Sequence, residues 1–282
     1  MVSETIGEET TSETIFERDM EKVSEVGPQV SEAAFVDALR CSCYSTGAVF
    51  RDHLTRIRAR IEDAARRSGR APSAVTLIGV TKAVPVERIR DALARGLADV
   101  GENRVQEAQA KRAALDAPAR WHLIGHLQRN KAKDAVELFD LIHSVDSPVL
   151  LEALERHAAA RGRRVELLLQ VNVSGEAAKH GCRPEDASAL AEAAGACPHV
   201  VCRGLMTLAP FSTNPEEARP HFRRLRELRD HLQATVHSPL VLSMGMSQDF
   251  EVAIEEGADL VRIGTALFGD RGHGAGGEGK DT

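Results

Sequence analysis

The chain has 282 residues, of which 43% are hydrophobic and 28% charged, and its formal net charge at pH 7 is −6. This length allows one large globular domain or two smaller ones. The acidic balance argues against a chain that binds nucleic acid over its whole surface, and the sequence has no apolar run of about 18 residues of the kind that crosses a membrane.

The cysteines and the N-terminus indicate in which cellular compartment the protein is expected. The five cysteines are odd in number and lack the spacing of zinc ligands; they are Cys41, Cys43, Cys182, Cys197 and Cys202. This pattern is typical of reduced thiols in a cytosolic protein. The N-terminus is acidic and has no apolar core of a secretory signal. We therefore expect the protein to stay in the cytoplasm.

Both ends of the chain differ in composition from its middle. Up to Arg40 the sequence contains ten acidic and three basic residues, many Ser and Thr, and few large apolar residues. This predicts a disordered or weakly helical acidic extension over residues 1–45. The Gly-rich C-terminus predicts a flexible tail over 271–282. One folded domain is expected between them, over 46–270.

The first elements of this domain are a helix and a strand. Apolar residues recur with a helical period over 47–68, which predicts a helix. The segment "VTLIGVTK" (75–82) is typical of a strand covered on both faces, yet it ends in Lys82. A buried ammonium is costly unless it is paired or neutral. Lys82 therefore either extends its charged end to the rim of the sheet or is a low-pKa amine that attacks a carbonyl.

The same alternation of strands and helices continues to residue 268. After 75–82, strands are predicted over 98–103, 120–125, 141–146, 165–172, 200–208, 240–245 and 260–268. After 47–68, helices are predicted over 86–95, 185–194, 215–233 and 249–256.

Eight strands alternating with helices predict an α/β fold, a closed (β/α)8 TIM barrel. No long helix follows the last strand, so the helix over 47–68 is expected to cover that seam. A doubly wound open sheet is the alternative.

In such a barrel the chemistry lies at the carboxyl ends of the strands. Polar residues cluster at these ends in the sequence, whereas the opposite ends are plainer. The polar residues at the carboxyl ends include Lys82, Asn103, His122, His126, His143, Asp146, Asn172 and Lys179. This asymmetry predicts a ligand site at the carboxyl-terminal face.

The last two strands end in segments suited to an anion. "LSMGMSQD" places Ser243 and Ser247 in a small-residue turn that leads into a helix, and "VRIGT" adds Gly264 and Thr265. Hydroxyls and free backbone N–H groups in such turns bind anions, and the loops after strands 7 and 8 are a recurrent phosphate site in this fold. With Lys82 across the barrel, a phosphate-bearing aldehyde is a natural ligand.

Arg262 lies inside the last predicted strand, in "LVRIG". It is expensive to bury there without a partner. It could pair with a carboxylate of the barrel, or it could face the ring nitrogen of a pyridine cofactor. Because a guanidinium keeps its protons, it would leave that nitrogen unprotonated and make the cofactor a weak electron sink.

Several of these motifs occur together in one known family. Lys82 with "VGENRVQE" (100–107), "WHLIGHLQRNK" (121–131), "LSMGMSQD" (242–249) and "VRIGTALFG" (261–269) resembles the pyridoxal phosphate homeostasis protein family. The fold of these proteins is similar to the N-terminal barrel of alanine racemase, the fold type III of pyridoxal phosphate-binding proteins. The resemblance runs from about residue 50 to 270.

The resemblance implies that pyridoxal 5'-phosphate is the cofactor and that Lys82 forms the internal aldimine (Schiff base) with it. It further implies that Arg262 faces the pyridine nitrogen and that Asn103 lies beside the cofactor. Lys179 matches a second family lysine near the site. The residues implied to hold the phosphate are Ser243, Ser247, Gly264 and Thr265.

The implied function is that of a non-enzymatic monomer in vitamin B6 homeostasis, which carries or buffers the cofactor for apo-enzymes. The alternative is a pyridoxal phosphate-dependent amino acid racemase or decarboxylase. Racemases of the alanine type need a second, mostly β domain and a tyrosine base. The one tyrosine, Tyr44, falls in the acidic extension, and we expect no second domain. A metal hydrolase using His122, His126 and His143 is disfavoured, because no fixed carboxylate completes the set.

Overall fold

The computed structural model describes residues 32–234 and 239–269. The first helix, α2 (Glu32–Arg67), begins earlier than the predicted 47. Residues from Gly47 onward form one compact unit, and Met1–Thr46 form a separate one. The predictions for residues 1–31 and for the tail lie outside the described residues, and the predicted domain boundaries stay predictions.

Eight parallel strands form a closed barrel in chain order, and the last strand pairs with the first. They are β1 (Thr76–Val80), β2 (Asp99–Glu102), β3 (Arg120–Leu123), β4 (Leu141–Val145), β5 (Val165–Gln170), β6 (Val200–Met206), β7 (Val241–Ser243) and β8 (Leu260–Ile263). The predicted (β/α)8 barrel is confirmed, and the open sheet is excluded. Each strand is shorter than its prediction, because polar and glycine-containing turns begin before the apolar run ends.

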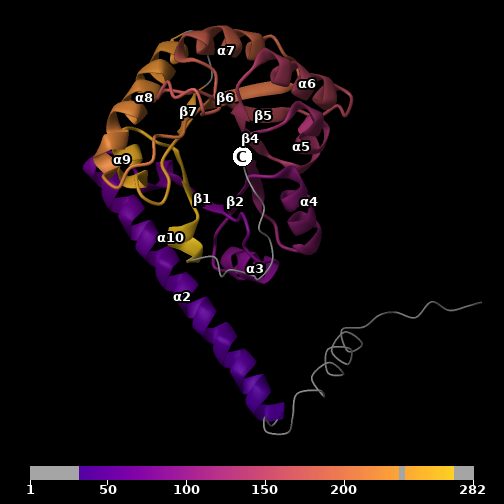
Figure 1. The fold of residues 1–282 in the computed structure, drawn as a ribbon, viewed down its shortest axis with the longest axis vertical. Coiled ribbons are helices and arrows are strands. Elements are labelled where there is room, and N and C mark those ends of the chain that lie inside the picture. Colours follow the sequence, from indigo (N-terminus) through magenta and orange to yellow (C-terminus); the bar gives the residue numbers. More distant parts are fainter. Residues whose placement is uncertain (1–31, 235–238, 270–282) are drawn as a thin grey trace, which may run out of the picture. The chain divides into compact units, whose positions relative to one another are not determined.

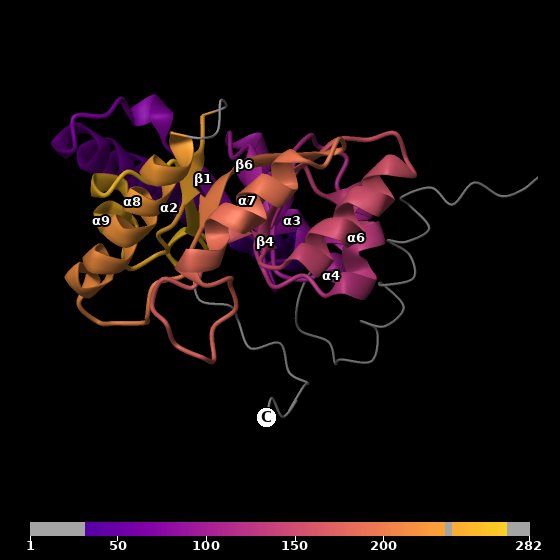
Figure 2. The same ribbon diagram turned by 90° about the horizontal axis from the view of Figure 1, so that it is seen from above.

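Helices surround the strands, as both views of the ribbon show (Figure 1, Figure 2). They are α3 (Val86–Ala94), α4 (Val105–Ala114), α5 (Ala132–Leu138), α6 (Pro148–Ala159), α7 (Ala187–Gly195), α8 (Arg219–Gln233), α9 (Phe250–Glu255) and α10 (Thr265–Phe268). The sequence predictions omit α4, α5 and α6. Across the described residues, no helix combines the length and apolar character that a membrane crossing requires.

The prediction of a strand over 260–268 is wrong beyond Ile263. Gly264 adopts a ψ of −85° and turns the chain into α10. A short apolar run such as "ALF" fits a strand or a helix equally well, because its length is too small to reveal a period. The turn brings Thr265 to the carboxyl-terminal face, and the apolar side chains of α10 pack inward.

The helix α2 covers the seam after β8, as expected. Its apolar side chains Phe50, Leu54, Ile57 and Ile61 are buried. Phe50 packs against Phe268 of α10 with ring centroids 5.5 Å apart, and Arg60 donates two hydrogen bonds to Glu251 of α9. These contacts place a helix from the start of the chain where the last βα unit lacks a long one.

Candidate functional site

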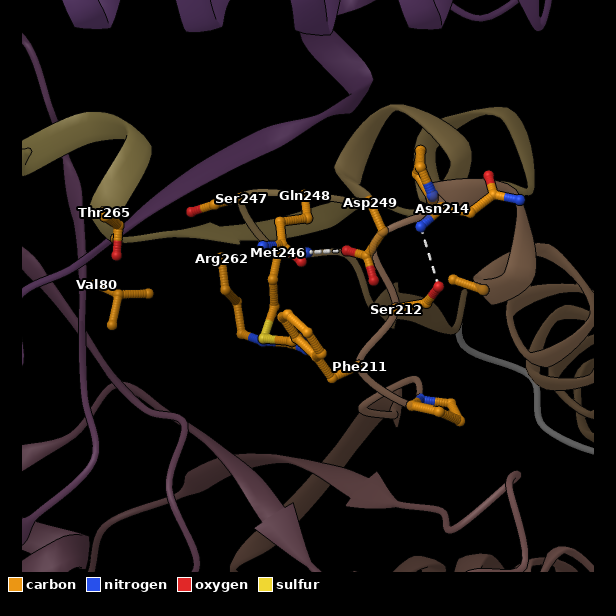
Figure 3. Close-up of a pocket in the computed structure, with 14 residues that line it drawn as sticks. Val80, Phe211, Ser212, Asn214, Met246, Ser247, Gln248, Asp249, Arg262 and Thr265 are labelled. Carbon is orange, nitrogen blue, oxygen red and sulfur yellow. Dashed lines mark hydrogen bonds between the residues drawn. The ribbon is translucent and has the colours of Figure 1, made fainter.

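A pocket of about 340 Å³ lies at the carboxyl ends of β1 and β8 and under the loops after β6 and β7. Four of the residues predicted from the sequence line it together: Ser247, Arg262, Gly264 and Thr265. Figure 3 shows three of their side chains with Val80 around one end, and Phe211, Ser212 and Asn214 around the other. The fold therefore gathers most of the predicted anion site in one place.

Arg262 is a buried cation without a carboxylate partner among the described residues. Its side chain is 3% exposed. Its Nη1 donates to Ser243 Oγ (2.5 Å) and its Nη2 donates to the Thr207 carbonyl oxygen (2.9 Å). Burial lowers the pKa of the guanidinium to about 10, an effect that the Asp249 carboxylate opposes. Arg262 therefore stays charged at pH 7 and is held by neutral oxygens.

Ser243 is predicted from the sequence to hold a phosphate, yet it is not among the residues that line the pocket. Its side chain is fully buried, and its Oγ lies 2.9 Å from His143 Nδ1 as well as accepting from Arg262. His143 in turn contacts His122, which contacts Asp99. Ser243 therefore supports Arg262 from inside the barrel. Sequence reasoning missed Asp99, because no motif marks it.

Two turns that line the pocket contain unpaired backbone donors. The N–H groups of Ser247, Gly264 and Thr265 make no hydrogen bond within the part of the chain that the structure describes. Since backbone N–H groups and hydroxyls are strong donors to anions, this end of the pocket is suited to a phosphate.

The turn that carries Ser247 is shaped by Gly245 and Asp249. Gly245 has a φ of +93°, and a Cβ built there would lie 2.6 Å from Ala253 Cβ. Only glycine fits such a close approach at positive φ. Asp249 Oδ1 accepts from the Met246 N–H (2.6 Å). The turn therefore depends on a glycine and on a carboxylate that sequence reasoning did not single out.

Lys82 is half-buried and lies in a turn beyond β1, two residues after Val80 of the pocket wall. Both of its neighbours are held by one cluster of charges. Lys111 Nζ donates to the Thr81 carbonyl oxygen (2.5 Å) and to Glu107 Oε1 (2.7 Å). The same Glu107 oxygen accepts from the Ala83 N–H (2.6 Å). Ala83 has a φ of +56°, a conformation that costs free energy outside glycine, so this cluster holds a strained turn in place.

Glu102, at the end of β2, completes that cluster from the barrel interior. Its Oε1 accepts from Thr81 Oγ1 (2.6 Å) and from Lys111 Nζ (2.7 Å), and its Oε2 has no hydrogen-bond partner among the described residues. Burial raises the pKa of Glu102 more than the nearby Lys111 lowers it. Lys82 itself makes no hydrogen bond or ion pair within the described residues.

Asn103 and Lys179 belong to the same face, but neither lines the pocket. Asn103 is half-buried after β2, and its backbone is approached so closely that a Cβ at Gly125 would lie 2.4 Å from its carbonyl oxygen. Lys179, in the loop after β5, pairs with Glu176 (2.9 Å). Lys82 and Asn103 thus lie at neighbouring strand ends, whereas Lys179 is engaged elsewhere.

The structure does not assemble the histidine set of the metal hydrolase alternative. His122 and His143 are buried and bonded to each other (2.9 Å). His126 instead stacks on His180, and these two with Asp146 offer ligand atoms within 4.8 Å of one another. Among the described residues this is the group that could hold a metal ion. Both of its imidazoles are exposed.

The chain is similar in sequence to known proteins over most of its length. Residues 53–272 match the family described as alanine racemase, N-terminal domain. The chain is 47% identical over 222 residues to the pyridoxal phosphate homeostasis protein of Aquifex aeolicus, covering 78% of this chain and 97% of that protein. It is 34% identical over 235 residues to the human protein of the same name, covering 77% and 85%.

Solved structures agree with these matches. PipY of Synechococcus elongatus with PLP bound superposes with a TM-score of 0.70 at 41% identity, covering 78% of this chain and all of that one. An alanine racemase of Clostridium difficile superposes with a TM-score of 0.66 at 14% identity, covering 81% and 58%. The second likeness shows a shared fold alone.

Proposed function

The chain belongs to the pyridoxal phosphate homeostasis protein family, and we propose that it binds pyridoxal 5'-phosphate covalently through Lys82. In this proposal it is a cytoplasmic monomer that buffers the cofactor and delivers it to apo-enzymes. Its partners are then the cofactor and these enzymes, with no nucleic acid or membrane involved.

One observation carries this proposal: a buried, charged Arg262 lines a pocket whose wall also contains residues with unpaired backbone N–H groups. A buried cation held only by neutral oxygens favours a ligand with an acceptor of its own. A pyridine nitrogen is such an acceptor, and the N–H groups of Ser247, Gly264 and Thr265 suit the phosphate of the same molecule. The residues present therefore fit this cofactor.

The positions of the side chains support one role for each in this proposal. When bound, the cofactor supplies an aldehyde, which condenses with an amine with loss of one water. Lys82 supplies that amine from a turn held by Lys111, and Asn103 lies beside it. Ser243 acts through Arg262, which it orients, whereas Ser247 donates its hydroxyl to the phosphate directly.

The pocket supports a carrier better than a racemase or a decarboxylase. A racemase needs two opposed acid–base groups. In the described pocket wall the one carboxylate is Asp249, and it accepts from the backbone of the Ser247 turn. Arg262 in addition leaves the pyridine nitrogen unprotonated, which weakens the cofactor as an electron sink. The pocket therefore lacks the acid–base groups and the strong electron sink that controlled carbanion chemistry needs.

The carrier function is tested by mixing the loaded protein with an apo-aminotransferase and following the recovery of aminotransferase activity. We expect recovery to reach the level obtained with an equal amount of free cofactor. Amino acid racemisation or decarboxylation by the loaded protein should stay below about one turnover per second, the lower end of ordinary enzyme rates. Faster turnover, without transfer, would establish the enzyme alternative instead.

Replacing Ser247 by alanine should weaken cofactor binding without changing its absorbance band. The variant loses one hydroxyl directed at a dianion, a charge-assisted hydrogen bond worth about 1.5–3 kcal/mol. The dissociation constant, measured by equilibrium dialysis, should rise roughly ten- to a hundredfold. Ser212→Ala is the matched control, because Ser212 lines the other end of the pocket and bonds to Glu217 (2.7 Å). Equal affinities for the two variants would place the phosphate elsewhere.

A further inference from the structure

A line of hydrogen bonds crosses the barrel interior and ends at Arg262. Asp99 Oδ1 lies 2.9 Å from His122 Nε2, His122 Nδ1 lies 2.9 Å from His143 Nε2, and His143 Nδ1 lies 2.9 Å from Ser243 Oγ. Ser243 Oγ accepts from Arg262 Nη1. The line thus uses β2, β3, β4, β7 and β8, and it joins the two ends of the barrel.

The two ends of this line differ in chemistry. Arg262 has only donors, so Ser243 Oγ must accept from it. Asp99, when ionised, has only acceptors, so His122 Nε2 must carry a proton. Asp99 begins β2 and lines a recess with Thr76 and Gly96, at the face opposite the candidate site. Its side chain is 15% exposed and has no other hydrogen-bond partner among the described residues.

With both imidazoles neutral, one set of tautomers satisfies every contact. His122 bears its proton on Nε2 and donates to Asp99, so its Nδ1 accepts from His143 Nε2–H. The unprotonated His143 Nδ1 then accepts a hydrogen bond from the Ser243 hydroxyl. The lone pairs of Ser243 Oγ remain available to accept from Arg262. In the reverse order, His122 Nε2 would face the Asp99 carboxylate with acceptor against acceptor.

The neutral state of His143 agrees with the surroundings of its ring. Both histidines are fully buried. Burial lowers the pKa of His143 well below its ordinary value, and the charge of Arg262 acts in the same direction, as a protonated His122 would. A protonated His122 would donate to His143 instead, and it would turn His143 Nδ1–H toward Ser243. The Ser243 O–H would then have to point away from His143, toward an acceptor outside this line of hydrogen bonds.

We infer that Asp99 is a remote positioning residue for the cofactor site. By fixing the tautomers of His122 and His143, its carboxylate directs the Ser243 hydroxyl inward. The Ser243 lone pairs are thereby kept for Arg262, whose second anchor is the Thr207 carbonyl. The part of this inference that concerns the cofactor rests on the proposed function, whereas the tautomers belong to the protein alone.

The tautomers can be read by two-bond ¹H–¹⁵N correlation spectra of protein labelled with ¹⁵N-histidine, without cofactor. In the unmodified protein under mildly alkaline conditions, His122 and His143 should each carry one ring proton, on Nε2. Peaks are assigned from His122→Asn and His143→Asn. In Asp99→Asn a carboxamide can donate or accept, so the Nδ1–H tautomer of His122 should become populated.

The effect on the site is read from cofactor binding by the same variant. Asp99→Asn should raise the dissociation constant of pyridoxal phosphate by roughly three- to tenfold and shift the absorbance maximum, because Arg262 is less firmly oriented. Glu166→Gln is the matched control: it removes a carboxylate near the same end of the barrel, where it pairs with Arg120 and Arg203. This control should keep the affinity and the spectrum of the unmodified protein.

Two results would overturn the inference. The first is a proton on His122 Nδ1, alone or together with Nε2, in the unmodified protein. The second is an Asp99→Asn variant whose tautomers change while its affinity and absorbance match those of the Glu166→Gln control. An unmodified protein that binds no pyridoxal phosphate would refute the proposed function, and with it the role of Asp99 toward the cofactor. The tautomer assignment would still be decided by the first result.

Discussion

Replacement of Lys82 by alanine is expected to abolish the covalent bond between the protein and pyridoxal phosphate. The unmodified protein should be yellow as isolated, or become yellow with added cofactor. After treatment with borohydride it should carry one cofactor on Lys82. Lys82 is the amine that follows β1 in a turn held on both sides by Lys111 and Glu107, and within the described residues its Nζ has no competing partner. Intact-protein and peptide mass spectrometry measure the adduct.

Some cofactor should remain bound to Lys82→Ala without a covalent bond, because the proposed phosphate donors of Ser247, Gly264 and Thr265 are unchanged. Lys133→Ala is the matched control, since Lys133 is an exposed lysine of α5; it should retain the full adduct. If Lys82→Ala kept a reducible adduct at the level of the control, the reactive amine would be another lysine. A colourless protein that stays colourless with added cofactor would refute the proposed function as a whole.

Replacement of Arg262 by glutamate is expected to change both the electronic state of the cofactor and the stability of the barrel. The introduced carboxylate would stabilise a protonated pyridine nitrogen and so make the ring a stronger electron sink. It would also lie against the Thr207 carbonyl oxygen, which now accepts from Arg262. A buried charge left without its partners costs about 3–5 kcal/mol, which corresponds to a melting temperature lower by roughly 6–20 °C for a domain of this size.

The two effects are separated by recording absorbance spectra well below the melting temperature of the variant. Arg262→Lys is the conservative control, because it keeps the positive charge; its absorbance maximum should stay near that of the unmodified protein. An Arg262→Glu variant that is folded, binds the cofactor and keeps the unmodified spectrum would show that Arg262 does not face the pyridine ring.

The amino-acid sequence by itself determined the barrel and predicted four residues that line one pocket, Ser247, Arg262, Gly264 and Thr265. Apolar runs of strand length, separated by amphipathic segments, place all eight strands, because a strand covered on both faces needs apolar residues throughout. Ser247, Gly264 and Thr265 could be predicted from the local sequence, because a turn of small residues at the end of any strand offers hydroxyls and backbone N–H groups to an anion. The short helix α10 could not, because four residues do not reveal a period.

Only the tertiary structure decided which polar side chains face the pocket and which serve it from within. The sequence pattern predicts the same role for Ser243 and Ser247. In the structure, however, Ser243 points into the barrel toward His143, one hundred residues away along the chain. Asp99 shows no motif, and its role depends on β2, β3, β4, β7 and β8 meeting in one interior. Hydrogen-bond partners across a closed barrel are set by register and strand order, and these arise from packing of the whole chain rather than from any local pattern.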